Sequence, residues 1–264
     1  MGDGQYLSGR VAVVTGAGSG IGQATAIELA HRGARISAVT LELEEARRTV
    51  SCIRAGGGEA IALGADVSVQ RQLEQAIDQT VEMWGRLDIV VANAGINGVW
   101  APLEELTADE WDHTQAVNMR GTFLTVKLAG PHLRRQGGSV IIVSSVNGNR
   151  IFSNTGATAY ACSKAAQVAF AKMIALEYAR YRVRVNVICP GSIQTDIDSS
   201  TERRDLGSIK APVEYPEGTV PLTHGQPGSP QQVADLIAFL ASDASSHISG
   251  TEIYIDGTES LLQG

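Results

Sequence analysis

The sequence has only three cysteines among its 264 residues, and they form no CxxC pair. Cys52, Cys162 and Cys189 are far apart along the chain, which argues against a disulfide framework or a thiolate metal site and favours a reducing compartment. The five histidines show no HExxH or related spacing, so a zinc hydrolase has no support. We therefore predict that the protein has no metal site.

Long apolar runs and clusters of basic residues are also missing. No run approaches the ~20 apolar residues that span a membrane, and no signal peptide opens the chain, so we expect a cytoplasmic protein without a membrane partner. The net charge is −7, and Lys and Arg are not clustered, which argues against nucleic acid as a partner.

Two common catalytic or nucleotide-binding motifs are absent as well. The chain has no Gly-x-Ser-x-Gly, the usual nucleophile turn of serine hydrolases. Its glycine-rich turn lacks the Lys-Ser/Thr ending of a nucleoside-triphosphate P-loop. The remaining classes of nucleotide-binding protein are those that use a glycine turn without that lysine.

Glycine, by contrast, is abundant, with 29 residues, and several fall in one short turn. The segment 16–22 follows the β-branched apolar run 11–15 and precedes a helical pattern over 23–31. In a strand–turn–helix unit, backbone N–H groups meet a pyrophosphate, and glycines let the phosphates approach the backbone. The predicted dinucleotide contacts in this turn are Gly16, Ser19, Gly20, Ile21 and Gly22.

Strand-like and helix-like segments alternate along the chain. Apolar strands are expected over 11–15, 35–40, 60–63, 88–92, 139–143 and 184–188, and helices over 23–31, 43–54, 70–84, 108–128 and 157–178. Such alternation, with nearly continuous apolar strands, predicts a parallel, doubly wound α/β sheet. Ligands of these sheets bind at the carboxyl ends of the strands, where 16–22, Asp66 and 93–95 fall.

One helical segment carries a tyrosine and a lysine four residues apart. Tyr160 and Lys164 therefore share one helical face. A phenol normally has a pKa of ~10, and a neighbouring ammonium lowers it, so such a pair can act as an acid/base. Pairs of this kind are common on helices and, taken alone, are more often structural.

Two further polar residues stand where ligands are expected. Ser145 follows the strand 139–143, so it and Tyr160, early on the next helix, can face one crevice. Asn118 lies within an apolar helix, where its amide needs a hydrogen-bond partner. Either residue alone is as readily structural as functional.

With these motifs in this order along the chain, the sequence resembles the short-chain dehydrogenase/reductase family, in its compact single-domain branch. The resemblance rests on Thr15-Gly16-x3-Gly20-x-Gly22, Asp66-Val67, Asn93-Ala94-Gly95, Asn118, Ser145, Tyr160-x3-Lys164, Pro190-Gly191 and Thr195. It implies a single domain over 1–264, a seven-stranded, mostly parallel Rossmann-like sheet with helices on both faces, a substrate lid around 192–226 and a homotetramer.

The resemblance also implies hydride transfer between NAD(P) and a secondary alcohol or ketone, as in a carbonyl reductase of the EC 1.1.1 type. Tyr160 would exchange the proton, and Lys164 would lower its pKa and hold the nicotinamide ribose. Ser145 would stabilise charge on the substrate oxygen, and Asn118 would hold a water in a proton relay. The further cofactor contacts implied are Thr40, Leu41, Asp66, Val67, Asn93, Ala94, Gly95, Tyr160, Pro190, Gly191, Ile193 and Thr195.

The position that separates NAD from NADP departs from the family pattern. Thr40 and Leu41 stand where an Asp would indicate NAD and a nearby Arg would indicate NADP. Ser19 is not basic, and Glu42 and Glu44 would disfavour an added phosphate. The sequence therefore favours NAD over NADP.

The substrate stays open among hydroxy and keto compounds, including 3-oxoacyl thioesters, cyclic alcohols, sugars and steroids. We expect its choice to lie with the segments 97–106, 147–158 and 192–226. An alternative function is a dinucleotide-binding redox sensor or scaffold without turnover, which does not require Ser145, Tyr160 and Lys164. A sugar epimerase or dehydratase is a third, although little chain follows Gly191 for a substrate domain.

Overall fold

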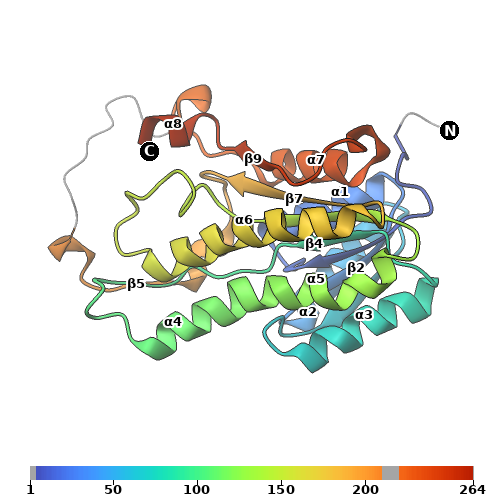
Figure 1. Cartoon of the computed structure of the whole chain (residues 1–264), viewed down its shortest axis with the longest axis horizontal. Coiled ribbons are helices and arrows are strands. Elements are labelled where there is room, and N and C mark those ends of the chain that lie inside the picture. The colour runs from blue at the N-terminus through green and yellow to red at the C-terminus, as the bar shows by residue number, and fades with distance from the viewer. Residues whose placement is uncertain (1–3, 210–219, 264) are drawn as a thin grey trace.

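Apolar, β-branched runs form the central sheet of the protein (Figure 1). The computed structural model describes residues 4–209 and 220–263. The strands are β1 (Val11–Thr15), β2 (Arg35–Thr40), β3 (Ala60–Gly64), β4 (Ile89–Ala92), β6 (Gly138–Val143), β7 (Val183–Pro190) and β9 (Glu252–Ile255). Every residue of β1 and β4 is buried, as expected for strands covered on both faces.

The sheet has seven strands in the order β3-β2-β1-β4-β6-β7-β9, and every neighbouring pair is parallel. The helices are α1 (Gly20–His31), α2 (Leu43–Ala55), α3 (Gln70–Trp84), α4 (Ala108–Gln115), α5 (Gly121–Leu133), α6 (Thr158–Ala179), α7 (Pro230–Ala241) and the short α8 (Glu259–Gln263). The doubly wound, Rossmann-like α/β fold predicted from the sequence is confirmed.

Two apolar cores, one on each face, hold the helices to the sheet. One core contains side chains of α3, α5 and α6, and the other contains side chains of α1, α2 and α7. Alternate residues of β1 serve the two cores: Val11 and Val13 face the first, and Ala12 and Val14 face the second. Both faces of the sheet are therefore covered, which leaves the carboxyl ends of the strands as the place where ligands can bind.

The helix expected over 108–128 is not one regular helix. A π turn, Ala116–Arg120, separates α4 from α5, and the helical path continues to Leu133. The backbone carbonyl of Asn118 accepts hydrogen bonds from the Thr122 hydroxyl (2.7 Å) and the Gln167 amide (2.9 Å). Because these side chains donate hydrogen bonds to it, the Asn118 carbonyl has partners even though the π turn interrupts the regular α-helical bonding.

A second, two-stranded sheet was not predicted. The strands β5 (Gly98–Trp100) and β8 (Thr201–Arg203) pair in parallel, although they lie about a hundred positions apart in the chain. In the described residues, no helix is long and apolar enough to cross a membrane. Within the same ranges, no three His, Cys, Asp or Glu side chains gather as metal ligands would.

Candidate active site

The glycine turn after β1 is locked to the end of β4. Gly16 has φ +66°, and a Cβ there would lie 2.8 Å from Asn93 Nδ2 and 2.9 Å from Ala94 Cα. The Asn93 amide donates to the Thr15 carbonyl at 3.0 Å, and the Asn93 N–H donates to the Thr15 hydroxyl at 3.0 Å. Asn93 and Ala94 thus fix the shape of the turn from the neighbouring strand.

The start of α1 has the features of a pyrophosphate site. Gly22 faces the Gly16 carbonyl so closely that a Cβ would lie 2.0 Å from its oxygen. Ser19, at the N-cap, is exposed, and its side chain makes no capping hydrogen bond, so the first N–H groups of α1 are left for an anion. A dinucleotide phosphate therefore fits the residues at this turn.

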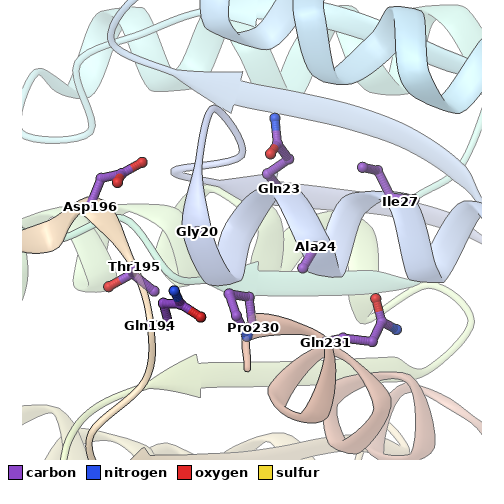
Figure 2. A pocket seen from close by; sticks show the side chains of 9 residues that line it. All are labelled: Gly20, Gln23, Ala24, Ile27, Gln194, Thr195, Asp196, Pro230 and Gln231. Atoms are coloured by element: carbon purple, nitrogen blue, oxygen red, sulfur yellow. The ribbon is translucent and has the colours of Figure 1, made fainter. Parts of the chain in front are cut away.

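The segment after β7 closes over the same turn. A Cβ on Gly20 would lie 3.1 Å from Thr195 Cγ2, so two predicted cofactor contacts from distant parts of the chain meet. Figure 2 shows Thr195 and Asp196 across from the start of α1. A cavity of about 370 Å³ lies there, lined by Gly20, Gln23, Ala24, Ile27, Gln194, Thr195, Asp196, Pro230 and Gln231. Ile193 and Gly191 belong to this connection, which runs on from Pro190 at the end of β7.

Four of the predicted cofactor contacts lie at or just after the ends of β2 and β3. Thr40 is buried at the end of β2, whereas the next residue, Leu41, is exposed. One carboxylate oxygen of Asp66 accepts from the Ser68 N–H (2.8 Å) and hydroxyl (2.7 Å), which fixes the turn into α3. Val67 is buried, and its Cγ2 lies so close to Gly121 that a Cβ there would approach to 2.7 Å.

Tyr160 and Lys164 project from α6, and Ser145 lies after β6. All three side chains are nearly inaccessible to solvent, and the Lys164 ammonium lies 5.4 Å from the centre of the Tyr160 ring. Lys164 Nζ donates to the Val143 carbonyl at 3.0 Å, and the Ser144 hydroxyl donates to the Lys164 carbonyl at 2.8 Å. These bonds tie the helix to the carboxyl end of β6.

Burial controls the titration of the pair. It raises the pKa of Tyr160 to about 12, against an opposing hydrogen bond with the Ser145 side chain. It also lowers the pKa of Lys164 to about 8. This differs from the expected lowering of the Tyr160 pKa by Lys164: desolvation dominates here, and the ammonium donates to Val143.

Asn118 connects the π turn to this cluster. Its amide donates to the Ile96 carbonyl (2.9 Å) and the Ser163 hydroxyl (3.0 Å), and its oxygen accepts from the Ile96 N–H (2.9 Å). A Cβ on Gly95 would lie 3.2 Å from the Asn118 oxygen and 3.5 Å from Lys164 Nζ. Asn118 therefore positions the chain beside Lys164, and its part in a water relay stays a prediction.

Known proteins resemble this chain in both sequence and structure. The family described as enoyl-(acyl carrier protein) reductase matches residues 16–258. A 3-ketoacyl-ACP reductase structure from Sinorhizobium meliloti is 49% identical, with a TM-score of 0.92, covering 96% of this chain and 99% of that chain. A short-chain type dehydrogenase/reductase structure from Mycobacterium marinum is 32% identical, with a TM-score of 0.86 and coverage of 97% and 98%. Levodione reductase of Leifsonia aquatica is 36% identical over 256 residues, 95% of this chain and 94% of that protein.

The chain is a short-chain dehydrogenase/reductase. As a member of that family it is an NAD(P)-dependent oxidoreductase with a small-molecule substrate. The resemblance drawn from Gly16–Gly22, Tyr160 and Lys164 is therefore confirmed at the level of the family.

In this short-chain dehydrogenase/reductase, the three predicted substrate segments contact one another. The pairing of β5 with β8 joins 97–106 to 192–226, and the Ala101 N–H donates to the Gly156 carbonyl in 147–158 at 3.3 Å. Residues 210–219 of the predicted lid lie outside the described residues. The described part of 192–226 is held in place by backbone pairing, and its opening and closing stay a prediction.

An ion pair that the sequence analysis missed holds this arrangement. Arg204, just after β8, donates to Glu110 at 2.5 Å and to the Glu105 carbonyl at 3.0 Å. Glu110 also completes a capping box with Thr107 at the start of α4. Its hydrogen bonds with Arg204 and Thr107 lower the pKa of Glu110 to about 2, so the carboxylate stays charged at any pH well above that. The Thr-x-x-Glu motif predicts the cap but not the arginine.

Proposed function

We propose that this enzyme interconverts a secondary alcohol and a ketone, with Tyr160 as the general acid/base. The observation that carries the proposal is the buried cluster of Ser145, Tyr160 and Lys164, with Lys164 beside Gly95. This cluster lies at the carboxyl ends of the strands, as the glycine turn does. A sensor or scaffold without turnover would not need these three side chains together. Two of the relatives are a levodione reductase and a 3-ketoacyl-ACP reductase, and their names support carbonyl chemistry of the EC 1.1.1 type.

The cofactor, when bound, supplies or accepts the hydride at its nicotinamide ring. Tyr160 donates a proton to the substrate oxygen in reduction and accepts one in oxidation. Its raised pKa of about 12 keeps the phenol protonated near neutral pH, the form needed to reduce a ketone. The Ser145 hydroxyl donates to the same oxygen and stabilises the charge that forms there.

Lys164 has two roles in this proposal. It holds the nicotinamide ribose through its ammonium, and it stabilises the phenolate that Tyr160 becomes after giving up its proton. Pro190, Gly191, Ile193 and Thr195 would contact the nicotinamide end of the bound cofactor, and the glycine turn would hold its pyrophosphate. NAD is the favoured cofactor, and a cytoplasmic location follows as part of the same proposal.

Turnover of a ketone panel tests the function. Reduced nicotinamide absorbance should fall when enzyme, cofactor and a suitable ketone or 3-oxoacyl thioester are mixed. The relatives make cyclic diketones and 3-oxoacyl thioesters the first compounds to include. Cofactor binding without turnover of any compound would favour the sensor instead.

The rate of ketone reduction should depend on the charge of Lys164. Because burial lowers its pKa to about 8, the side chain is an ammonium below that pH and a neutral amine above it. We expect kcat/KM for reduction to fall as pH rises through about 8, since the Tyr160 phenolate then loses its counter-charge. A pH profile measures this, and a flat profile on both sides of pH 8 would contradict it. Lys172→Gln, an exposed ion-paired lysine on the same helix, should leave the profile unchanged.

Assembly as a homotetramer is part of the proposal. Met173 and Leu176 on α6 are 77% and 84% exposed, and Leu261 near the C-terminus is 75% exposed. Exposed apolar side chains on one helix face support burial against another copy. Light scattering should give four times the 27.8 kDa chain mass, and a monomer mass would contradict this.

A further inference from the structure

Gly18, in the middle of the dinucleotide turn, is a glycine for a reason other than its backbone. Its φ is not in the left-handed region, unlike those of Gly16 and Gly20. A Cβ at Gly18 would instead lie 2.5 Å from Oε2 and 2.7 Å from Cβ of Glu45, and 3.2 Å from Oγ1 of Thr40. No side chain fits at this position because Glu45 packs directly on the turn.

Hydrogen bonds join α2, the helix that carries Glu45, to the dinucleotide turn. Thr49, one turn later on α2 and fully buried, donates from its hydroxyl to the Ala17 carbonyl at 2.8 Å. The Gln23 amide of α1 donates to the Gly18 carbonyl (3.2 Å) and the Thr49 hydroxyl (3.1 Å). These contacts fasten α2 to the turn and so fix the backbone from which the Glu45 side chain reaches Gly18.

We propose that Glu45 recognises the 2′ position of the cofactor's adenosine ribose and excludes a 2′-phosphate. The proposal rests on the dinucleotide site of the proposed function. The adenosine end of such a cofactor lies beside the end of the second strand, and that is where Thr40 and Glu45 adjoin Gly18. A carboxylate there can accept hydrogen bonds from ribose hydroxyls, whereas a phosphate ester would bring a like charge of nearly two units against it.

The acidic residues named from the sequence do not have this position. Glu42 and Glu44 are both exposed, and Glu44 pairs with Arg47 on the outer surface of α2. Glu45 also faces Arg48, at 3.7 Å, but that arginine side chain is 66% exposed, so solvent screens the pair. The Glu45 side chain is less exposed, at 38%, and its carboxylate lies nearer to the Cβ position of Gly18 than to Arg48.

Dissociation constants of NAD⁺ and NADP⁺, measured by calorimetry without substrate, test the proposal. We expect the wild-type enzyme to bind NAD⁺ at least about tenfold more tightly than NADP⁺. Glu45→Gln should tighten NADP⁺ binding by about tenfold and weaken NAD⁺ binding by about threefold, as a charged acceptor becomes neutral. Glu44→Gln, the matched control on the exposed face, should change neither constant by more than about twofold.

Three outcomes would overturn the inference in different ways. If the wild type binds both dinucleotides and Glu45→Gln leaves their ratio unchanged, Glu45 does not discriminate, while the proposed function stands. If the wild type binds neither dinucleotide, the proposed function fails and the inference fails with it. The double variant Glu45→Gln/Arg48→Gln separates lost repulsion from a freed arginine: a gain in NADP⁺ affinity that persists supports exclusion by Glu45, and one that disappears assigns it to Arg48.

Discussion

Replacing Tyr160 by phenylalanine is expected to lower kcat for ketone reduction by about 10²- to 10⁴-fold, the contribution of a positioned acid/base. The change removes only the hydroxyl that transfers the proton and keeps the buried ring beside Lys164. Cofactor affinity and thermal stability should therefore stay close to those of the wild type. Steady-state kinetics, dinucleotide titration and a melting curve measure the three quantities.

Tyr178→Phe provides the matched control for this experiment. Tyr178 lies on the same helix, is also buried, and also has a pKa raised first by burial. Its side chain packs by Arg134 and Gly130, away from the candidate active site. The control should keep kcat within about twofold, because a hydroxyl outside the site moves no proton. Equal losses in both variants, or loss of dinucleotide binding in Tyr160→Phe, would make Tyr160 a structural residue.

Replacing Gly22 by alanine should abolish dinucleotide binding or weaken it by about a hundredfold or more, since 1.4 kcal/mol corresponds to a factor of ten. The added Cβ would lie 2.0 Å from the Gly16 carbonyl oxygen and 2.5 Å from Asn93 Nδ2. The turn must open to relieve this clash, and its phosphate-binding shape is lost. Overpacking of this kind also costs about 1–3 kcal/mol of folding free energy.

Gly56→Ala is the control for the glycine experiment. Gly56 follows α2 with φ −80°, and a Cβ there meets its nearest neighbours at an ordinary 3.4 Å. The control should bind both dinucleotides as the wild type does and unfold at nearly the same temperature. Calorimetry and thermal melting compare the two variants, and a Gly22→Ala enzyme with wild-type affinity would show that the turn does not bind the pyrophosphate.

The sheet and the glycine turn were predictable because their causes are local. Strands buried on both faces must be apolar along their whole length, as β1 and β4 are, so the sequence shows them without any long-range knowledge. The turn at 16–22 is visible for a similar reason, since Gly16 and Gly20 have positive φ and Gly22 has no room for a side chain. The candidate catalytic residues came from the family resemblance together with their positions at strand ends.

The features that were missed depend on contacts between distant segments. The π turn at Asn118 is stabilised by Gln167 from another helix, which no local pattern reveals. The strands β5 and β8 have three residues each, too few to show a periodicity. Glu45 was also missed: it lies four residues before the buried Thr49, but the same spacing relates Glu42 to the buried Ala46, so spacing alone does not single out Glu45.

A crystal structure of the enzyme with its nicotinamide cofactor and a ketone would show whether Tyr160 is placed to transfer the proton. We expect the phenol oxygen of Tyr160 within about 2.6–3.2 Å of the ketone oxygen, the reach of a general acid. We also expect the pyrophosphate against Gly16–Gly22 and the ammonium of Lys164 on the nicotinamide ribose. A ketone oxygen held by other groups, with the Tyr160 hydroxyl directed elsewhere, would contradict proton transfer by Tyr160.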